Sequence, residues 1–174
     1  MRTSLRKSPR LKGFDYAGPY GYNVTVVTRR RQPVFRNASI VEIALEALER
    51  ACRQHGFTLH AYCFMPDHVH LLVSGGTDSR LPDFVHLFKQ LSSFQAKQAL
   101  DTPLWQISYY DHVVRREEDL ADIIRYIWNN PVRAGLADEP ADYPYSGPQP
   151  LDAGRPEGLQ LHDARIHGKE VRSP

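Results

Sequence analysis

Hydrophobic and polar residues follow two periods along this chain, and each period predicts one kind of element. Four alternating or β-branched segments predict strands at 22–28, 57–64, 68–74 and 109–115. Apolar residues spaced three and four apart predict helices over about 39–55, over about 82–100 and over a third segment that Pro131 ends. The order of the predicted elements is therefore β-α-β-β-α-β-α.

Local signals mark the ends of the first two helices. Ser39 followed by Glu42 forms a capping box at the start of the first helix, and Gly56 suits its C-terminal end. Pro82 suits the first turn of the second helix. The predicted buried stripe of the second helix consists of Phe84, Leu87, Phe88, Leu91 and Phe94.

The first six elements match the split βαβ sheet of ferredoxin-like and RRM-like folds, so we predict the α+β class. Such an antiparallel sheet carries two helices on one face and leaves the other face open. The third helix is an addition that can cover part of the open face. Its predicted buried stripe consists of Leu120, Ile123, Ile124, Ile127 and Trp128.

The two ends of the chain lack this periodicity. Residues 1–20 carry charge, Gly and Pro, and we interpret them as a basic arm. Residues 138–174 contain six prolines and little periodic pattern, which predicts an irregular tail. We therefore expect one folded domain, over residues 21–137.

Composition narrows the class of protein. Hydrophobic residues make up 41% and charged residues 24%, the balance of a globular protein. No apolar run approaches the roughly 18 residues of a membrane span, which excludes an integral membrane protein. Cys52 and Cys63 are too few for a disulfide scaffold or a four-cysteine zinc site. Since the basic N-terminus also lacks a signal-like apolar segment, we expect a cytoplasmic protein.

Positive charge is concentrated near the N-terminus. Nine Lys or Arg residues and one acidic residue lie within 1–36, a local charge of +8, so the net charge of +2 leaves −6 for the rest. This asymmetry favours a polyanionic partner. A solvated basic tail is the alternative that charge alone leaves open.

The strand at 68–74 carries the first candidate for chemistry. Alternation turns Val69, Leu71 and Val73 toward the helices and places His68 and His70 side by side on the open face. Two imidazoles spaced in this way can share one metal ion. A pair of surface or stacking histidines is the alternative.

The third helix carries a second candidate. Tyr126 and Asn130 are one turn apart, on one flank of its apolar stripe. If this helix packs on the open face, a phenol and an amide oxygen could be brought to the two histidines. The alternatives are a packing tyrosine and a helix-end cap before Pro131.

Several basic and aromatic residues are candidates for contact with nucleic acid. Lys89, Ser93 and Lys97 form a row on the second helix that could follow a phosphate backbone. A solvated helix face would have the same pattern. The remaining candidates for phosphate contact are Arg29, Arg30, Arg31, Arg125 and Arg133, and those for base stacking are Tyr109, Tyr110 and His112.

Five motifs together resemble one known family. They are FMPDHVHLLV at 64–73, LWQ at 104–106, YDH at 110–112, YIWNNPVRAGL at 126–136 and DYPYS at 142–146. This combination resembles the REP-associated tyrosine transposases, which belong to the single-tyrosine HUH class of insertion-sequence transposases. The resemblance extends from about Tyr22 to Ser146.

The resemblance implies a ferredoxin-like sheet with an added tyrosine helix, and activity on single-stranded DNA that carries hairpins of repetitive palindromic elements. It implies Tyr126 as the nucleophile, a 5′-phosphotyrosine intermediate, and Mg²⁺ or Mn²⁺ on His68, His70 and Asn130. Relatives act as monomers or homodimers, and the sequence leaves this choice open.

Two positions depart from the family pattern. Asp67 replaces the commoner Asn of the MPN turn, although either residue can form an Asx turn. Asn23 stands in the first strand where many relatives have His.

Two other functions compete with this interpretation. A metal-dependent hydrolase could use His68 and His70, with Asp67 or Asp111, to activate water, and Tyr126 would then be dispensable. A non-catalytic nucleic-acid-binding module could use the open sheet face, as RRM domains do. Its binding would be independent of metal.

Overall fold

An antiparallel sheet forms the centre of the molecule in the computed structural model, which describes residues 13–115 and 120–148. Its strands are β1 (Gly21–Val27), β2 (Phe57–Met65), β3 (His68–Gly75), β4 (Tyr110–Val113) and β5 (Ser146–Gly147). Their spatial order is β4-β1-β3-β2-β5, and every pairing is antiparallel. The predicted α+β class and split βαβ sheet are confirmed.

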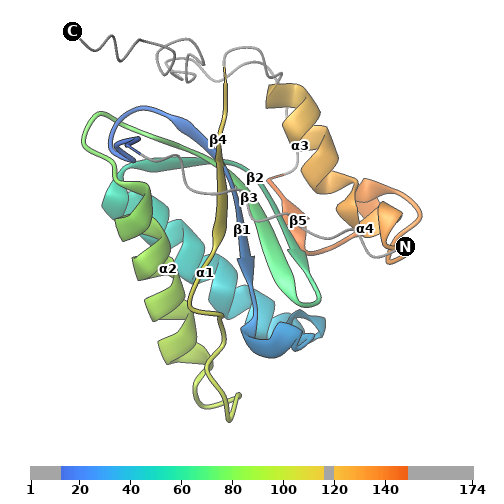
Figure 1. The fold of residues 1–174 in the computed structure, drawn as a ribbon. Helices are drawn as coiled ribbons and strands as arrows, with labels where there is room; N and C mark the ends of the chain where they lie inside the picture. Colours follow the sequence, from blue (N-terminus) through green and yellow to red (C-terminus); the bar gives the residue numbers. More distant parts are fainter. Residues whose placement is uncertain (1–12, 116–119, 149–174) are drawn as a thin grey trace, which may run out of the picture.

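Helices cover the two faces of this sheet unequally (Figure 1). The long helices α1 (Ala38–His55) and α2 (Leu81–Ala96) pack against each other on one face. The short helices α3 (Leu120–Trp128) and α4 (Asn130–Arg133) pack at the β2 side of the sheet. No helix within the described ranges is long and apolar enough to cross a membrane.

The main core lies between the sheet and the two long helices. Alternate residues of β1 and β3 point into it, and Val24 and Leu71 are completely buried. The other alternating positions of the core strands are Tyr22, Val26, Val69 and Val73, and the helices contribute Ile40, Ala44, Leu48, Phe84 and Phe88. This arrangement confirms the predicted alternation of β3 and sends its other side chains to the opposite face.

At the ends of α1, the predicted N-terminal cap is wrong and the predicted C-terminal glycine is confirmed. The helix is capped by Asn37, whose side chain accepts a hydrogen bond from the backbone N–H of Ser39, so the capping box predicted for Ser39 and Glu42 is wrong. Asn is as good an N-cap as Ser, and here it lies two residues earlier. Gly56 ends the helix with φ of 65°, a left-handed conformation that suits glycine, as predicted.

The predicted end and apolar stripe of α2 need correction. The helix ends at Ala96 instead of near 100, and Phe94 is 78% exposed. Ser92 and Ala96 define the buried face. Phe94 is two residues from each, which rotates it by roughly 200° at about 100° per residue, onto the outer face.

A second, smaller apolar cluster occupies the opposite face of the sheet. Leu120, Ile124 and Ile127 of α3 pack there against Cys63 and Leu72. The helix therefore covers part of the face that a plain split βαβ sheet leaves open, as predicted, and most of its predicted stripe is buried.

The folded region extends beyond the predicted boundary at residue 137. Tyr143 is buried in the second cluster, and its hydroxyl donates a hydrogen bond to the carbonyl of Phe64 at 2.8 Å. β5 then pairs with the edge of β2. Prolines made this segment resemble a tail, but here they border a strand and a short helical turn. Residues 149–174, and residues 1–12 of the predicted arm, lie outside the described residues.

Candidate metal and tyrosine site

The two histidines of β3 meet on the face that α3 covers. The Nε2 atoms of His68 and His70 are 3.1 Å apart, and their rings meet edge to face with centroids separated by 4.7 Å. His70 is buried at 8% exposure, and the side chain of His68 is 18% exposed. The predicted pair of neighbouring imidazoles is confirmed as geometry.

Thr25 supports His70 from the neighbouring strand. The two residues are direct partners in the β1–β3 register, and the Thr25 hydroxyl lies 3.1 Å from Nδ1 of His70. Burial, followed by the influence of nearby His68, lowers the pKa of His70 to about 3. The imidazole is therefore neutral at physiological pH, and neutral imidazole is the form that binds metal ions.

Asp67 supports His68 in a similar way. One carboxylate oxygen lies 2.5 Å from Nδ1 of His68, and the other accepts a hydrogen bond from Arg31 at 2.9 Å. Burial alone would raise the pKa of Asp67, but the hydrogen bonds and charges of His68 and Arg31 outweigh burial and lower it. Because an ionised carboxylate only accepts hydrogen bonds, Nδ1 of His68 carries the proton and Nε2 presents a lone pair.

Thr25 and the contact between Arg31 and Asp67 were not among the residues and contacts predicted from the sequence. Alternation in the first strand could have found Thr25, since it places that residue on the face of the histidines. The contact with Arg31 spans 36 positions and depends on an irregular turn, so periodicity contains no signal for it.

Tyr126 and Asn130 lie one turn apart, as predicted, across the junction of α3 and α4. Tyr126 is 48% exposed, and the guanidinium carbon of Arg133 lies 5.0 Å from its ring centroid. Nδ2 of Asn130 donates hydrogen bonds to the carbonyls of Tyr126 and Ile127, at 2.9 and 3.2 Å. Because both of these carbonyls are acceptors, the amide nitrogen of Asn130 faces the helix. The side-chain oxygen takes part in neither hydrogen bond and is available to bind a metal ion.

The four predicted site residues meet in two separate pairs, His68 with His70 and Tyr126 with Asn130. Within the described part of the chain, no hydrogen bond joins Tyr126 or Asn130 to either histidine. Nor does that part contain a group of three His, Cys, Asp or Glu side chains that could hold a metal ion. A third protein ligand from this region would therefore have to be of another type, such as the amide oxygen of Asn130.

Asp111 is excluded as a partner of the histidine pair. It is paired in register with Val24, which points into the main core, so both side chains face α1 and α2. The predicted role of Asp111 in a hydrolase that uses His68 and His70 is therefore wrong. The sequence could not show this, because aromatic and apolar residues at 109–115 fall on both faces of the strand and so do not define its inward face.

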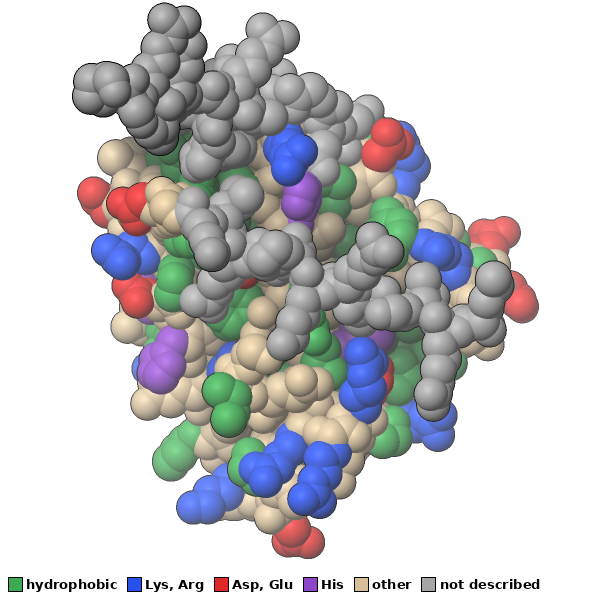
Figure 2. Space-filling model, in the orientation of Figure 1, with side chains coloured by type: hydrophobic (Ala, Val, Ile, Leu, Met, Phe, Trp, Pro, Cys, Tyr) green, Lys and Arg blue, Asp and Glu red, His purple; other side chains and the backbone are tan. Residues whose placement is uncertain are grey.

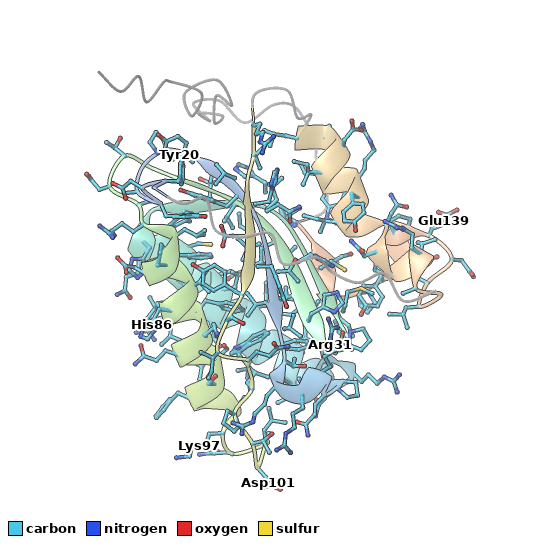
Figure 3. All side chains as sticks on the ribbon, viewed as in Figure 1. Tyr20, Arg31, His86, Lys97, Asp101 and Glu139 are labelled. Carbon is cyan, nitrogen blue, oxygen red and sulfur yellow. The ribbon has the colours of Figure 1, made fainter. Side chains whose placement is uncertain are left out.

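The predicted basic row on α2 is interrupted at Lys89. Its ammonium donates hydrogen bonds to the carbonyls of Gln106 and Ile107, at 2.5 and 2.7 Å, and burial lowers its pKa. Lys89 thus anchors the segment before β4. Lys97 is exposed, and it lies near the end of α2 (Figure 3).

The arginine candidates are spread over two surfaces. Arg29, Arg30 and Arg31 form an exposed 3-10 turn after β1, and Lys and Arg side chains gather at this lower end of the molecule in Figure 2. On α3, exposed Arg125 forms an ion pair with Asp122.

Comparison with known proteins identifies relatives that match most of the folded region. The family model described as "Transposase IS200 like" matches residues 19–130, a range that includes the histidine pair, Tyr126 and Asn130. A Haemophilus influenzae protein with the provisional name REP-associated tyrosine transposase is 28% identical over 137 residues, and the match covers 72% of this chain and 77% of that protein.

Two solved structures share the fold. A REP-associated tyrosine transposase bound to a REP hairpin matches with a TM-score of 0.66 at 22% identity, over 75% of this chain and 78% of that one. A candidate transposase from Deinococcus radiodurans matches with a TM-score of 0.50 at 30% identity, over 68% of this chain and 96% of that one. Because the family model covers more than half of the sequence, this chain belongs to the IS200-like transposase family and is an enzyme that acts on DNA.

Proposed function

We propose that this transposase cleaves and rejoins single-stranded, hairpin-bearing DNA through a covalent bond to Tyr126, with the help of a divalent metal ion. The observation that carries the proposal is the imidazole pair of His68 and His70 on the sheet face that α3 covers, since α3 also bears Tyr126. The relative that was solved with a REP hairpin supports hairpin DNA as the substrate.

The residues present fit a metal ion. The two Nε2 atoms are 3.1 Å apart, close enough to bind one ion with metal–nitrogen bonds of about 2.1 Å. The side-chain oxygen of Asn130 is our proposed third ligand. An amide oxygen together with phosphate oxygens favours Mg²⁺ or Mn²⁺. When bound, the ion would polarise the scissile phosphate and balance its developing negative charge.

Tyr126 performs the covalent step. Its phenolic oxygen attacks phosphorus, the bond between phosphorus and the 3′ oxygen breaks, and the released 3′ oxygen takes up a proton. The product is a 5′-phosphotyrosine and a free 3′-hydroxyl. The guanidinium of Arg133 stacks over the Tyr126 ring, which places a positive charge beside the attacking oxygen, where it can contact the negatively charged phosphate. Attack of a 3′-hydroxyl on the phosphotyrosine reverses the step, so rejoining needs no nucleotide cofactor.

Basic residues at two places would hold the phosphate backbone. The turn of Arg29, Arg30 and Arg31 lies beside Asp67 and the histidine strand, whereas Arg125 and Arg133 flank Tyr126. Lys97 extends the first group along the lower end of the molecule, and Lys89 supports the fold instead. We propose that the enzyme acts in the cytoplasm, as a monomer or as a homodimer.

The first prediction is that Tyr126→Phe abolishes the covalent adduct while DNA binding survives, because the phenol oxygen is lost and the aromatic ring is kept. The purified chain is incubated with hairpin oligonucleotides and Mg²⁺ or Mn²⁺, and adducts are separated on a denaturing gel. Tyr20→Phe is the matched control, because Tyr20 precedes β1 at the end remote from His68 (Figure 3). An adduct in the Tyr126 variant, or cleavage by the wild type without any adduct, would contradict the proposal.

A further inference from the structure

A chain of polar contacts leads from the basic turn to the histidine pair. Arg31 donates to one oxygen of Asp67 at 2.9 Å, and the other oxygen is 2.5 Å from Nδ1 of His68. His68 in turn meets His70 through Nε2. The Asp67 carboxylate therefore joins the surface guanidinium of Arg31 to His68, a candidate metal ligand.

The backbone around Asp67 is fixed as firmly as its side chain. Its carbonyl accepts hydrogen bonds from both the N–H and the hydroxyl of Thr28, each at 2.9 Å. Thr28 is itself completely buried at the end of β1. The turn between β2 and β3 is thus tied to the segment that leads into the three arginines.

The arginine turn holds an unfavourable conformation. Arg30 and Arg31 have φ of 53° and 54°, in the left-handed region, which is unfavourable for residues other than glycine. Strain of this kind persists where surrounding contacts determine it, and it is concentrated at functional sites. Here the conformation coincides with the contact between Arg31 and Asp67.

We propose that Asp67 is a positioning residue for His68, and that Arg31 acts through Asp67 by holding its carboxylate in place. Asp67 keeps the proton of His68 on Nδ1 and directs the Nε2 lone pair toward His70. This inference rests on the proposed function in one respect, namely that His68 binds the metal ion. Partners of this type change metal affinity by about 10- to 100-fold when they are removed.

The test uses the full-length chain and two readouts. The first is the affinity for Mn²⁺, measured by titration calorimetry without DNA. The second is the tautomer of His68 in the metal-free protein, measured by ¹⁵N NMR at an alkaline pH where imidazoles are neutral. Melting temperatures of all variants show whether a change arises from a loss of folding.

We expect Asp67→Ala to weaken Mn²⁺ binding by about 10- to 100-fold and to shift the His68 proton toward Nε2. Asp67→Asn keeps an acceptor for Nδ1, so it should retain the tautomer and lose less affinity. Arg31→Ala should weaken binding in the wild type but not in the Asp67→Ala background. Arg29→Ala removes the same charge from the same turn and should leave both readouts unchanged.

The outcomes separate this inference from the proposed function. If the wild type binds Mn²⁺ and Asp67→Ala changes neither readout, the positioning role is wrong and the metal site stands. If the wild type shows the Nδ1 proton but binds no Mn²⁺, the metal site is wrong and the orientation by Asp67 stands. Equal effects of Arg31→Ala in both backgrounds would show that Arg31 does not act through Asp67.

Discussion

Among single residues, Thr25 shows most clearly why a hydroxyl suits this site. With His68 protonated on Nδ1, the 3.1 Å contact between the two Nε2 atoms requires a proton on Nε2 of His70. Nδ1 of His70 is then an acceptor, and the Thr25 hydroxyl donates to it. If His70 binds a metal ion through Nε2, its proton moves to Nδ1 and the same hydroxyl accepts. Thr25 can satisfy both states because it both donates and accepts.

Replacing Thr25 tests this role. Thr25→Val leaves a buried nitrogen of His70 without its partner, and we expect a loss of about 1–3 kcal/mol in the free energy of unfolding. Mn²⁺ affinity should also fall. Thr25→Ser keeps the hydroxyl and should recover most of the affinity. Denaturant unfolding and calorimetry measure the two quantities, and a Val variant with wild-type values for both would refute the role.

How well the sequence predicted each contact of the site depends on how far apart in the sequence the two residues lie. The alternation of β3 predicted that His68 and His70 share a face, because side-chain direction in a strand is local. The contact between Arg31 and Asp67 joins two distant turns, and the anchoring of Lys89 by Gln106 and Ile107 depends on where a loop passes. Interactions of that kind follow from the folded chain and leave no periodic pattern.

At the scale of elements, the junction of α3 and α4 is shaped by Pro131. We expected this proline to stop the helix, yet a further short helix, α4, includes it. Pro131 has no N–H to give to the carbonyl of Ile127, and Nδ2 of Asn130 donates to that carbonyl instead. The side chain of Asn130 thus replaces the missing backbone hydrogen bond, and this bond also fixes the orientation of the side chain.

Substitutions at Asn130 should separate these two roles. Asn130→Ala loses both hydrogen bonds to the helix, which should cost about 1–2 kcal/mol of stability, and it also loses the proposed ligand. Asn130→Asp cannot donate to the carbonyls, so it should lose stability but keep metal affinity. Unfolding and Mn²⁺ titration provide the measurements.

A neighbouring residue provides the control. Asn129 donates to the carbonyl of Arg125 at 2.8 Å, so Asn129→Ala should lose stability without a change in metal affinity. If the Asn130 and Asn129 variants bound Mn²⁺ equally well, Asn130 would not be a ligand.

Most elements could be predicted because their periodicity is strong, and the errors have local causes. Phe94 was assigned to the core because it follows Leu91 by three residues and continues the apolar spacing, but its angular position on α2 faces solvent. The segment 138–148 was assigned to a tail because it is rich in proline, but Tyr143 anchors it through a distant carbonyl. Hydrophobic character and turn composition do not by themselves fix the direction of a side chain or the path of a loop.

At the scale of the whole molecule, charge is distributed unevenly along the chain. Residues 1–36 carry +8, and the remainder carries −6. This remainder by itself would attract DNA weakly, so the basic segments within 1–36 have to supply much of the attraction to phosphate. The turn at Arg29–Arg31 places part of this charge beside the histidine strand.

Deleting residues 1–12 tests the contribution of the arm. The deletion removes five positive charges and no negative charge. We expect weaker binding to single-stranded DNA and a salt dependence whose slope falls by up to about 0.7 for each lost phosphate contact. The Tyr126 adduct should still form at higher DNA concentrations. Binding isotherms across a salt series measure the slope, and an unchanged slope would show that the arm does not contact phosphate.

The separation of the interior into two clusters has a kinetic consequence. The main cluster joins the sheet to α1 and α2, whereas α3 rests on the smaller cluster of the opposite face. Detaching α3 exposes only the smaller cluster, so this helix can open locally while the sheet remains folded. Such an opening of α3 displaces Tyr126 and leaves the histidine pair on β3 in place. Under the proposed function, a Tyr126 bonded to a DNA end can move away together with Asn130 and return, while His68 and His70 stay in place on β3 between the two transfers of one reaction cycle.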